Sequence, residues 1–105
     1  MTDRFSNAFE CYEAIGQYLR EWAPKPWDQI TVDFKIIEID DVSERSITYI
    51  PRGSSRLGEF SIRDTNFTQC FFNLARVTSS PDKGFFRTCS FRLYSDGRYE
   101  ADFGY

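Results

Sequence analysis

The most concentrated chemical feature of this sequence is a run of carboxylates between residues 28 and 44. This stretch holds six acids against one base, Lys35, although the whole chain has a formal net charge of only -3. The acids are Asp28, Asp33, Glu38, Asp40, Asp41 and Glu44. Paired carboxylates can act as general acid and base, and a group of them can dock a basic partner and raise its association rate. The other reading is a solvated hairpin whose edge charges prevent aggregation.

Other residues that could do chemistry are few. Histidine, the commonest general base and metal ligand, is absent from the 105-residue chain. The three cysteines, Cys11, Cys70 and Cys89, are far apart and form no Cys-x-x-Cys pair. This pattern argues against a disulfide framework and a zinc site. We expect buried, reduced thiols, no cofactor or metal, and no enzymatic activity, with a reactive thiol as the alternative.

The composition predicts one small globular domain over residues 1–105. An estimated pI of about 4.9 disfavours direct nucleic-acid binding, because phosphate contacts need a basic surface. No apolar run approaches the roughly 20 residues of a membrane span. The N-terminus has no signal-peptide pattern, so we expect a cytoplasmic protein without membrane contacts.

The elements that must position the carboxylates follow from hydrophobic periodicity. Apolar residues recur at helical spacing from Phe5 to Trp22, with Phe9, Tyr12, Ile15, Gly16 and Leu19 between them. They predict an amphipathic helix over about residues 6–22. Asp3 or Ser6 is the expected cap, and the prolines at positions 24 and 26 end the helix.

Three strands follow this helix. Clean alternation predicts a strand over residues 30–36, and a shift of that alternation indicates a bulge near residues 36–37. A turn over residues 40–43 leads to a second strand over residues 45–50. A short third strand is expected over residues 58–62.

A second helix begins at Asp64-Thr65-Asn66, where Asn66 and Gln69 make a plausible capping box. Its apolar face is expected to hold Phe67, Cys70, Phe71, Leu74, Ala75 and Thr78. The loop over residues 79–84 ends this helix and leads into the C-terminal segment.

The C-terminal segment predicts a β-hairpin with arms over residues 86–94 and 98–105. Ser95-Asp96-Gly97 forms a three-residue loop, which Gly97 closes in the left-handed conformation. The resulting register gives one apolar face and one charged face. The apolar face sets Cys89, Phe91 and Leu93 opposite Phe103, Ala101 and Tyr99, and the charged face pairs Arg92 with Glu100 and Ser90 with Asp102. The predicted order α-β-β-β-α-β-β indicates an α+β fold, with an antiparallel sheet covered on one face.

Arginines and aromatic residues alternate in the C-terminal hairpin and offer a second reading of function. They are Arg87, Arg92 and Arg98 with Phe86, Tyr94 and Tyr99. Such a sheet surface could stack single-stranded RNA, which makes a small RNA- or ligand-binding regulator the alternative function. The opposing reading pairs Arg92 with Glu100 and buries Tyr99.

The chain resembles the YezG-like immunity proteins of bacterial polymorphic and contact-dependent growth-inhibition toxin systems. The resemblance is carried by the aromatic helix ending at Trp22, by Pro26-Trp27 leading into Ile30-Thr31-Val32-Asp33-Phe34, and by the segment Phe91–Tyr105. It covers most of the chain and is loose in the middle, where residues 51–58 are rich in arginine and serine.

The resemblance implies a cytoplasmic antidote that binds the C-terminal toxin domain of a cognate effector and blocks its active site. Toxins of such systems are often nucleases with basic substrate grooves, and an acidic surface can mimic the phosphate charge that these grooves bind. We therefore expect the partner-binding residues to be Asp33, Glu38, Asp40, Asp41 and Glu44. The competing surface is the arginine-containing loop from Arg52 to Arg56, which would meet an acidic partner instead.

Overall fold

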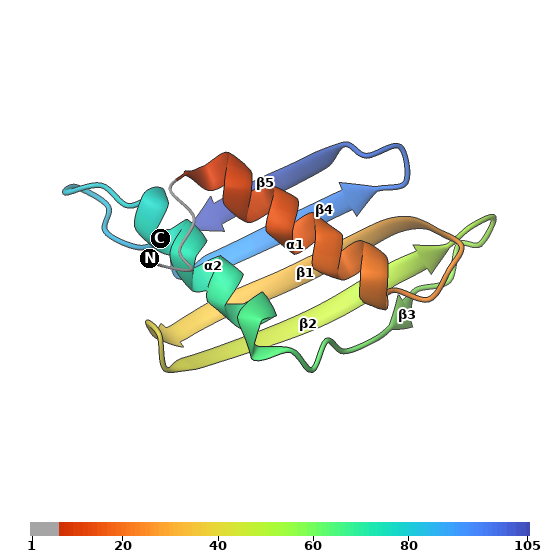
Figure 1. The fold of residues 1–105 in the computed structure, drawn as a ribbon, viewed down its shortest axis with the longest axis horizontal. Coiled ribbons are helices and arrows are strands. Elements are labelled where there is room, and N and C mark those ends of the chain that lie inside the picture. Colours follow the sequence, from red (N-terminus) through yellow and green to blue (C-terminus); the bar gives the residue numbers. More distant parts are fainter. Residues whose placement is uncertain (1–6) are drawn as a thin grey trace.

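The computed structural model describes residues 7–105 and has the predicted α+β architecture, in the order α-β-β-β-α-β-β (Figure 1). The elements are α1 (Ala8–Trp22), β1 (Trp27–Glu38), β2 (Val42–Pro51), β3 (Gly58–Glu59), α2 (Thr65–Val77), β4 (Thr88–Tyr94) and β5 (Tyr99–Gly104). The expected caps Asp3 and Ser6, and the apolar Phe5, lie outside the described residues.

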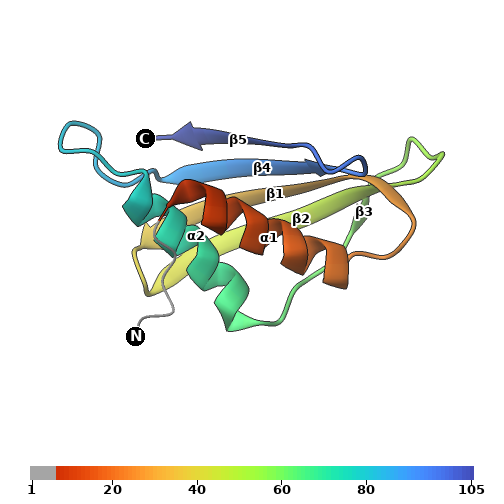
Figure 2. The same ribbon diagram turned by 45° about the horizontal axis from the view of Figure 1, so that its top comes forward.

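The five strands form one antiparallel sheet in the order β3-β2-β1-β4-β5, with the long β1 at its centre. Both helices pack on the same face of this sheet (Figure 2). Because side chains alternate along a strand, each strand turns every second residue towards the helices and the others away from them. The sheet therefore has a buried inner face and an open outer face.

Helix α1 starts and packs differently from the prediction. Its cap is Asn7, whose Oδ1 accepts a hydrogen bond from the Glu10 N–H at 2.9 Å. The buried residues of the helix are Cys11, Ile15, Gly16 and Leu19. Phe9 and Trp22, predicted to lie on the core stripe, are 62% and 42% exposed. The prediction placed the buried stripe of the helix by its large apolar residues. The stripe instead follows the i, i+4 series Cys11, Ile15 and Leu19.

The strands confirm the predicted bulge and correct three lengths. Strand β1 spans Trp27–Glu38, whereas residues 30–36 were predicted. The β1–β2 register shifts between Ile36 and Glu38, as the broken alternation indicated. Strand β2 already begins at Val42, because the turn occupies only residues 39–41. Strand β3 has two residues, whereas residues 58–62 were predicted. The chain leaves the sheet after Phe60 and buries Ile62 in the core.

Helix α2 is capped by Asp64, whose carboxylate accepts from the Asn66 N–H at 2.9 Å, so the predicted Asn66–Gln69 capping box is wrong. Five of the six residues predicted for its apolar face are buried. Phe72 and Asn73 are buried as well, which the narrower predicted stripe missed. The α2 helix therefore buries a wide face, because it packs both on the sheet and against α1, which lies beside it on the same face (Figure 1).

The C-terminal hairpin has the predicted register at every pair, from Leu93–Tyr99 to Cys89–Phe103. Gly97 has a φ of 95°, the left-handed conformation that the loop requires. The inward residues of β4 are fully buried, while those of β5 are half-buried because β5 is the last strand of the sheet.

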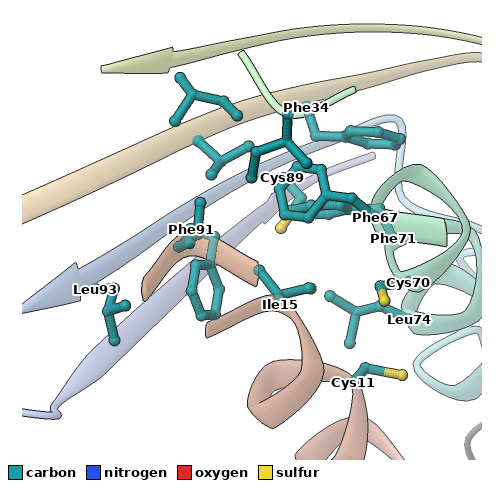
Figure 3. Packing of buried hydrophobic residues seen from close by; sticks show 14 of the residues in the cluster. Cys11, Ile15, Phe34, Phe67, Cys70, Phe71, Leu74, Cys89, Phe91 and Leu93 are labelled. Atoms are coloured by element: carbon teal, nitrogen blue, oxygen red, sulfur yellow. The ribbon is translucent and has the colours of Figure 1, made fainter. Parts of the chain in front are cut away.

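The core between the sheet and the helices is rich in stacked aromatic rings (Figure 3). Phe34 of β1 stacks on Phe71 of α2, with ring centroids 4.4 Å apart and an angle of 11°. Phe91 of β4 lies against Tyr12 of α1, with centroids 6.0 Å apart. Offset stacks of this kind add to the large burial of each ring and fix both helices on the sheet.

Candidate acidic partner-binding surface

The structure distributes the acidic stretch over three places. Asp33 of β1 and Glu44 of β2 lie on the outer face of the sheet, in register with Ser46 and Lys35 respectively. Glu38, Asp40 and Asp41 lie at or beside the β1–β2 turn. Asp28 lies at the other end of β1, where it is 3.7 Å from the Arg52 guanidinium. The linear run of charge is therefore not one continuous patch.

Carboxylates from elsewhere in the chain join Asp33 and Glu44 on the outer face. Glu100 and Asp102 come from β5, in register with Arg92 and Ser90, and Glu59 of β3 pairs with Thr48. We call these five exposed residues the acidic face: Asp33, Glu44, Glu59, Glu100 and Asp102. The cations of the sheet on that side are Lys35 and Arg92. The charged face of the hairpin was predicted, but its proximity to Asp33 depends on the β1–β4 pairing.

An open depression of about 550 Å³ lies in the middle of this face. Its floor is low because the sheet carries small side chains there, at Ser46, Thr88, Ser90 and Gly104. Asp33, Glu44 and Asp102 line it together with Lys35. A protruding cationic side chain of a partner can therefore approach three carboxylates over a floor of small side chains, with Lys35 and Arg45 also at the lining.

Four of the five predicted contact residues have exposed, unpaired carboxylates. Asp33, Glu38, Asp41 and Glu44 form no ion pair with any of residues 7–105. Asp40 differs, because it forms an ion pair with Arg76 of α2 and accepts a hydrogen bond from Gln69 Nε2 at 3.3 Å. Its backbone has a φ of 63°. Asp40 therefore ties the β1–β2 turn to α2, which sequence reasoning did not anticipate.

Arg92 forms ion pairs with two carboxylates of the outer face. Its Nη2 is 2.8 Å from Asp102 Oδ2 and 3.7 Å from Glu100 Oε2. The predicted cross-strand pair with Glu100 is thus the longer of the two contacts. Hydrogen bonding to Asp102 raises the pKa of Arg92, and the Tyr94 hydroxyl donates to Glu100 at 2.6 Å, which raises the pKa of Tyr94.

The three aromatic residues of the arginine-aromatic pattern, Phe86, Tyr94 and Tyr99, have different surroundings. Phe86 is buried at 1% exposure, and the ring of Tyr99 packs on Tyr12 with centroids 5.3 Å apart. The Arg98 guanidinium lies 4.9 Å from the centroid of Tyr94 and 2.7 Å from Asp96. This arrangement offers nucleic acid fewer free cations and rings than the sequence pattern indicated.

The three thiols are free and buried in the core, as predicted. Desolvation by burial raises the pKa of Cys11 to about 11 and the pKa values of Cys70 and Cys89 to about 12. Figure 3 places Cys11 on α1 near Cys70 on α2, and Cys89 on the inner face of the sheet. Such thiols stay protonated and are poor nucleophiles.

Comparison with known proteins adds no relative: the sequence matches no family model and no curated protein. Within residues 7–105, neither helix has the length and apolar composition that crossing a membrane requires.

Proposed function

We propose that the chain is a cytoplasmic immunity protein that binds a bacterial nuclease toxin domain and blocks its active site without catalysing a reaction itself. The proposal starts from the resemblance of the N-terminal helix and the C-terminal hairpin to YezG-like immunity proteins. It is supported by the carboxylates of the acidic face, which lie on the outer side of the sheet, and by those of the β1–β2 turn, which lie at one end of the sheet.

The observation that carries the proposal is the set of exposed carboxylates without ion pairs. In the described part of the chain, Asp33 and Glu44 on the acidic face and Glu38 and Asp41 at the turn form no ion pair, although Glu44 lies opposite Lys35 in the β1–β2 register. Elsewhere the same sheet does pair its charges, as at Arg92 and Asp102. Unpaired carboxylates repel one another, and a basic partner relieves this repulsion. They also steer such a partner during diffusional encounter.

The geometry suits a partner that normally binds a polyanion. Strand pairing places Asp33 and Asp102 in one row across the sheet and Glu44 in the next row, so carboxylates of β1, β5 and β2 lie together on one face. A nuclease groove lined with Lys and Arg side chains binds phosphates at repeated positions. The acidic face presents charges to such a groove, and the depression beside Asp33 admits a protruding cation.

The decisive experiment uses the toxin domain encoded beside the gene for this chain. Expression of that domain alone should stop bacterial growth, and co-expression of this chain should restore it. The purified proteins should form a complex whose association slows as salt rises. If co-expression does not restore growth and no complex forms, the chain is not the immunity protein of that toxin.

A charge-reversal set tests the surface. The variant Asp33→Lys, Asp41→Lys, Glu44→Lys should fold normally, bind the toxin domain at least about tenfold more weakly, and show a flatter salt dependence. Asp40 is left unchanged because it holds Arg76. The matched control is a second triple, made of exposed residues away from the outer face: Glu13→Lys, Glu21→Lys and Asp82→Lys. Equal losses in both triples would indicate a net-charge effect without a defined interface.

A further inference from the structure

The last strand of the sheet, β5, has an open edge. It is the terminal strand in the order β3-β2-β1-β4-β5 and is six residues long. The Tyr94 N–H donates to the Arg98 carbonyl at 2.9 Å, so Tyr94 and Arg98 are a hydrogen-bonded pair. From this pair onward, hydrogen-bonded and non-hydrogen-bonded residue pairs alternate along the hairpin. The backbone N–H and C=O groups of Glu100 and Asp102 therefore form hydrogen bonds with β4. Tyr99, Ala101 and Phe103 direct their backbone N–H and C=O groups outward.

Nothing in residues 7–105 pairs with these outward groups. No backbone or side-chain hydrogen bond beyond the β4 ladder reaches the backbone of Tyr99, Ala101 or Phe103. The opposite edge is different, because the chain after β3 runs along β2. There the Phe60 N–H donates to the Ile47 carbonyl at 3.2 Å, and Arg45 reaches across to the Ile62 carbonyl. The edge of β5 is thus the better template for an added strand.

The side chains of β5 specify what kind of strand fits. On the outer face Glu100 and Asp102 share one cation, Arg92, so the edge carries a net negative charge. On the inner face Tyr99, Ala101 and Phe103 are apolar and half-exposed. A strand that pairs with β5 places its own alternating side chains beside these two rows. It matches them when basic residues alternate with apolar ones.

A second copy of this chain does not match. Suppose that two copies of the chain pair through antiparallel β5 strands, with the helices of both copies on the same side of the joined sheet. Outer-face residues of one β5 then lie opposite outer-face residues of the other. Pairing centred on Ala101 sets Glu100 opposite Asp102 of the second copy, and pairing centred on Asp102 sets two identical carboxylates together. Like charges directly opposite each other destabilise a strand pair. The same charges that oppose self-pairing favour a basic strand.

We propose that β5 binds an extended segment of the protein partner, with alternating basic and apolar side chains, as a sixth antiparallel strand of the sheet. This proposal rests on the proposed function for the identity of the partner, the toxin domain, and adds the binding mode. Lys or Arg side chains lie beside Glu100 and Asp102, and apolar side chains cover Phe103 and Tyr99. Backbone hydrogen bonds form at Tyr99, Ala101 and Phe103.

The first test removes one outward N–H. In Ala101→Pro the lost N–H faces away from β4, so the hairpin ladder is kept, whereas an added strand loses a bond and meets the proline ring. Ala101→Val is the matched control, because it keeps the N–H. The probe is a capped synthetic peptide of alternating valine and lysine, whose binding is followed by NMR. We expect wild type and Ala101→Val to bind it with new protection of the Ala101 and Phe103 amides, and Ala101→Pro to bind roughly tenfold more weakly or not at all. Equal binding by Ala101→Pro, or protection elsewhere, would overturn the proposal.

The second test exchanges the charge and does not depend on how well the proline variant folds. The variant Glu100→Lys, Asp102→Lys should lose the lysine peptide and gain a peptide of alternating valine and glutamate. An unchanged preference for the lysine peptide would contradict the proposed register. A wild-type dimer in analytical ultracentrifugation that Ala101→Pro abolishes would show that a second copy occupies the edge, and this also overturns the proposal.

The toxin domain separates this proposal from the proposed function. If it binds wild type and Ala101→Pro equally tightly, the function stands and the added strand does not. If it fails to bind wild type while the lysine peptide binds at β5, the strand-binding edge stands and the proposed toxin partnership fails.

Discussion

Asp40 and Arg76 form an ion pair that joins the β1–β2 turn to helix α2, across thirty-six positions of sequence. The same carboxylate accepts a hydrogen bond from Gln69, which also donates to Asn73. The turn that carries Glu38 and Asp41 is thereby held against the helix. A fixed turn presents these two carboxylates in one arrangement, so the partner that we propose would bind there at a lower entropic cost.

Asp40 should matter for stability more than its neighbour. Asp40→Ala removes the ion pair with Arg76 and places an alanine at a φ of 63°, where the left-handed conformation costs about 1–2 kcal/mol. We expect urea unfolding to show a loss of at least that size. Asp40→Gly tolerates the backbone conformation and isolates the loss of the pair. Asp41→Ala is the control and should change the free energy of unfolding by under about 0.5 kcal/mol. Equal effects at both positions would argue against the Arg76 contact.

Phe91 should be one of the most sensitive core positions. Its side chain is fully buried, and its ring packs against those of Tyr12 and Tyr99 at centroid distances of 6.0 and 5.7 Å. Phe91→Ala should lower the free energy of unfolding by about 3–5 kcal/mol, since it leaves a cavity between α1 and the sheet. Phe9→Ala is the matched control, because Phe9 is 62% exposed. A small effect at Phe91 together with a large one at Phe9 would reverse the assigned packing of α1.

The thiols should react only when the protein unfolds. Burial raises the pKa of Cys11 to about 11 and that of Cys89 to about 12, so almost none of either is thiolate near neutral pH. Labelling of the native protein with Ellman's reagent should be slow at all three cysteines and complete in denaturant. Rapid labelling of one cysteine in the native protein would identify an accessible thiol and contradict the packing of that site.

The hairpin loop should carry a small acid-sensitive contribution to stability. The Arg98 backbone N–H, and then its side chain, donate to Asp96, which lowers the pKa of that carboxyl below its ordinary 3.8. A lowered pKa in the folded state means that the stabilisation is fully present above pH 3.8 and is lost as the pH falls through the lowered value. An NMR titration should find the Asp96 midpoint below 3.8, and Asp96→Asn should remove the acid-dependent change at Arg98. A midpoint at or above 3.8 would show that these hydrogen bonds do not form in solution.

The sequence was sufficient wherever the signal was local. The register of the C-terminal hairpin follows from loop length and two-residue alternation, because a slip of one residue would turn Phe91 to solvent. The bulge before Glu38 follows from the same alternation. The sequence determined the first residue of each helix less well than the hairpin register, since several neighbouring polar residues can each cap a helix. Asn7 caps α1 and Asp64 caps α2, and docking of α1 on the sheet leaves Phe9 outside the core.

What the sequence alone determined is therefore the order of elements, the α+β class, the hairpin register and the excess of acid between residues 28 and 44. The order of the strands and the docking of the helices decide which of these acids lie close together. Strand order places Asp33 near Asp102, sixty-nine positions away, and helix docking neutralises Asp40 with Arg76, while Asp41 forms no ion pair with residues 7–105. The physical reason is that side-chain alternation is a property of neighbouring residues. Pairing and neutralisation of charge depend instead on contacts between segments that the core brings together.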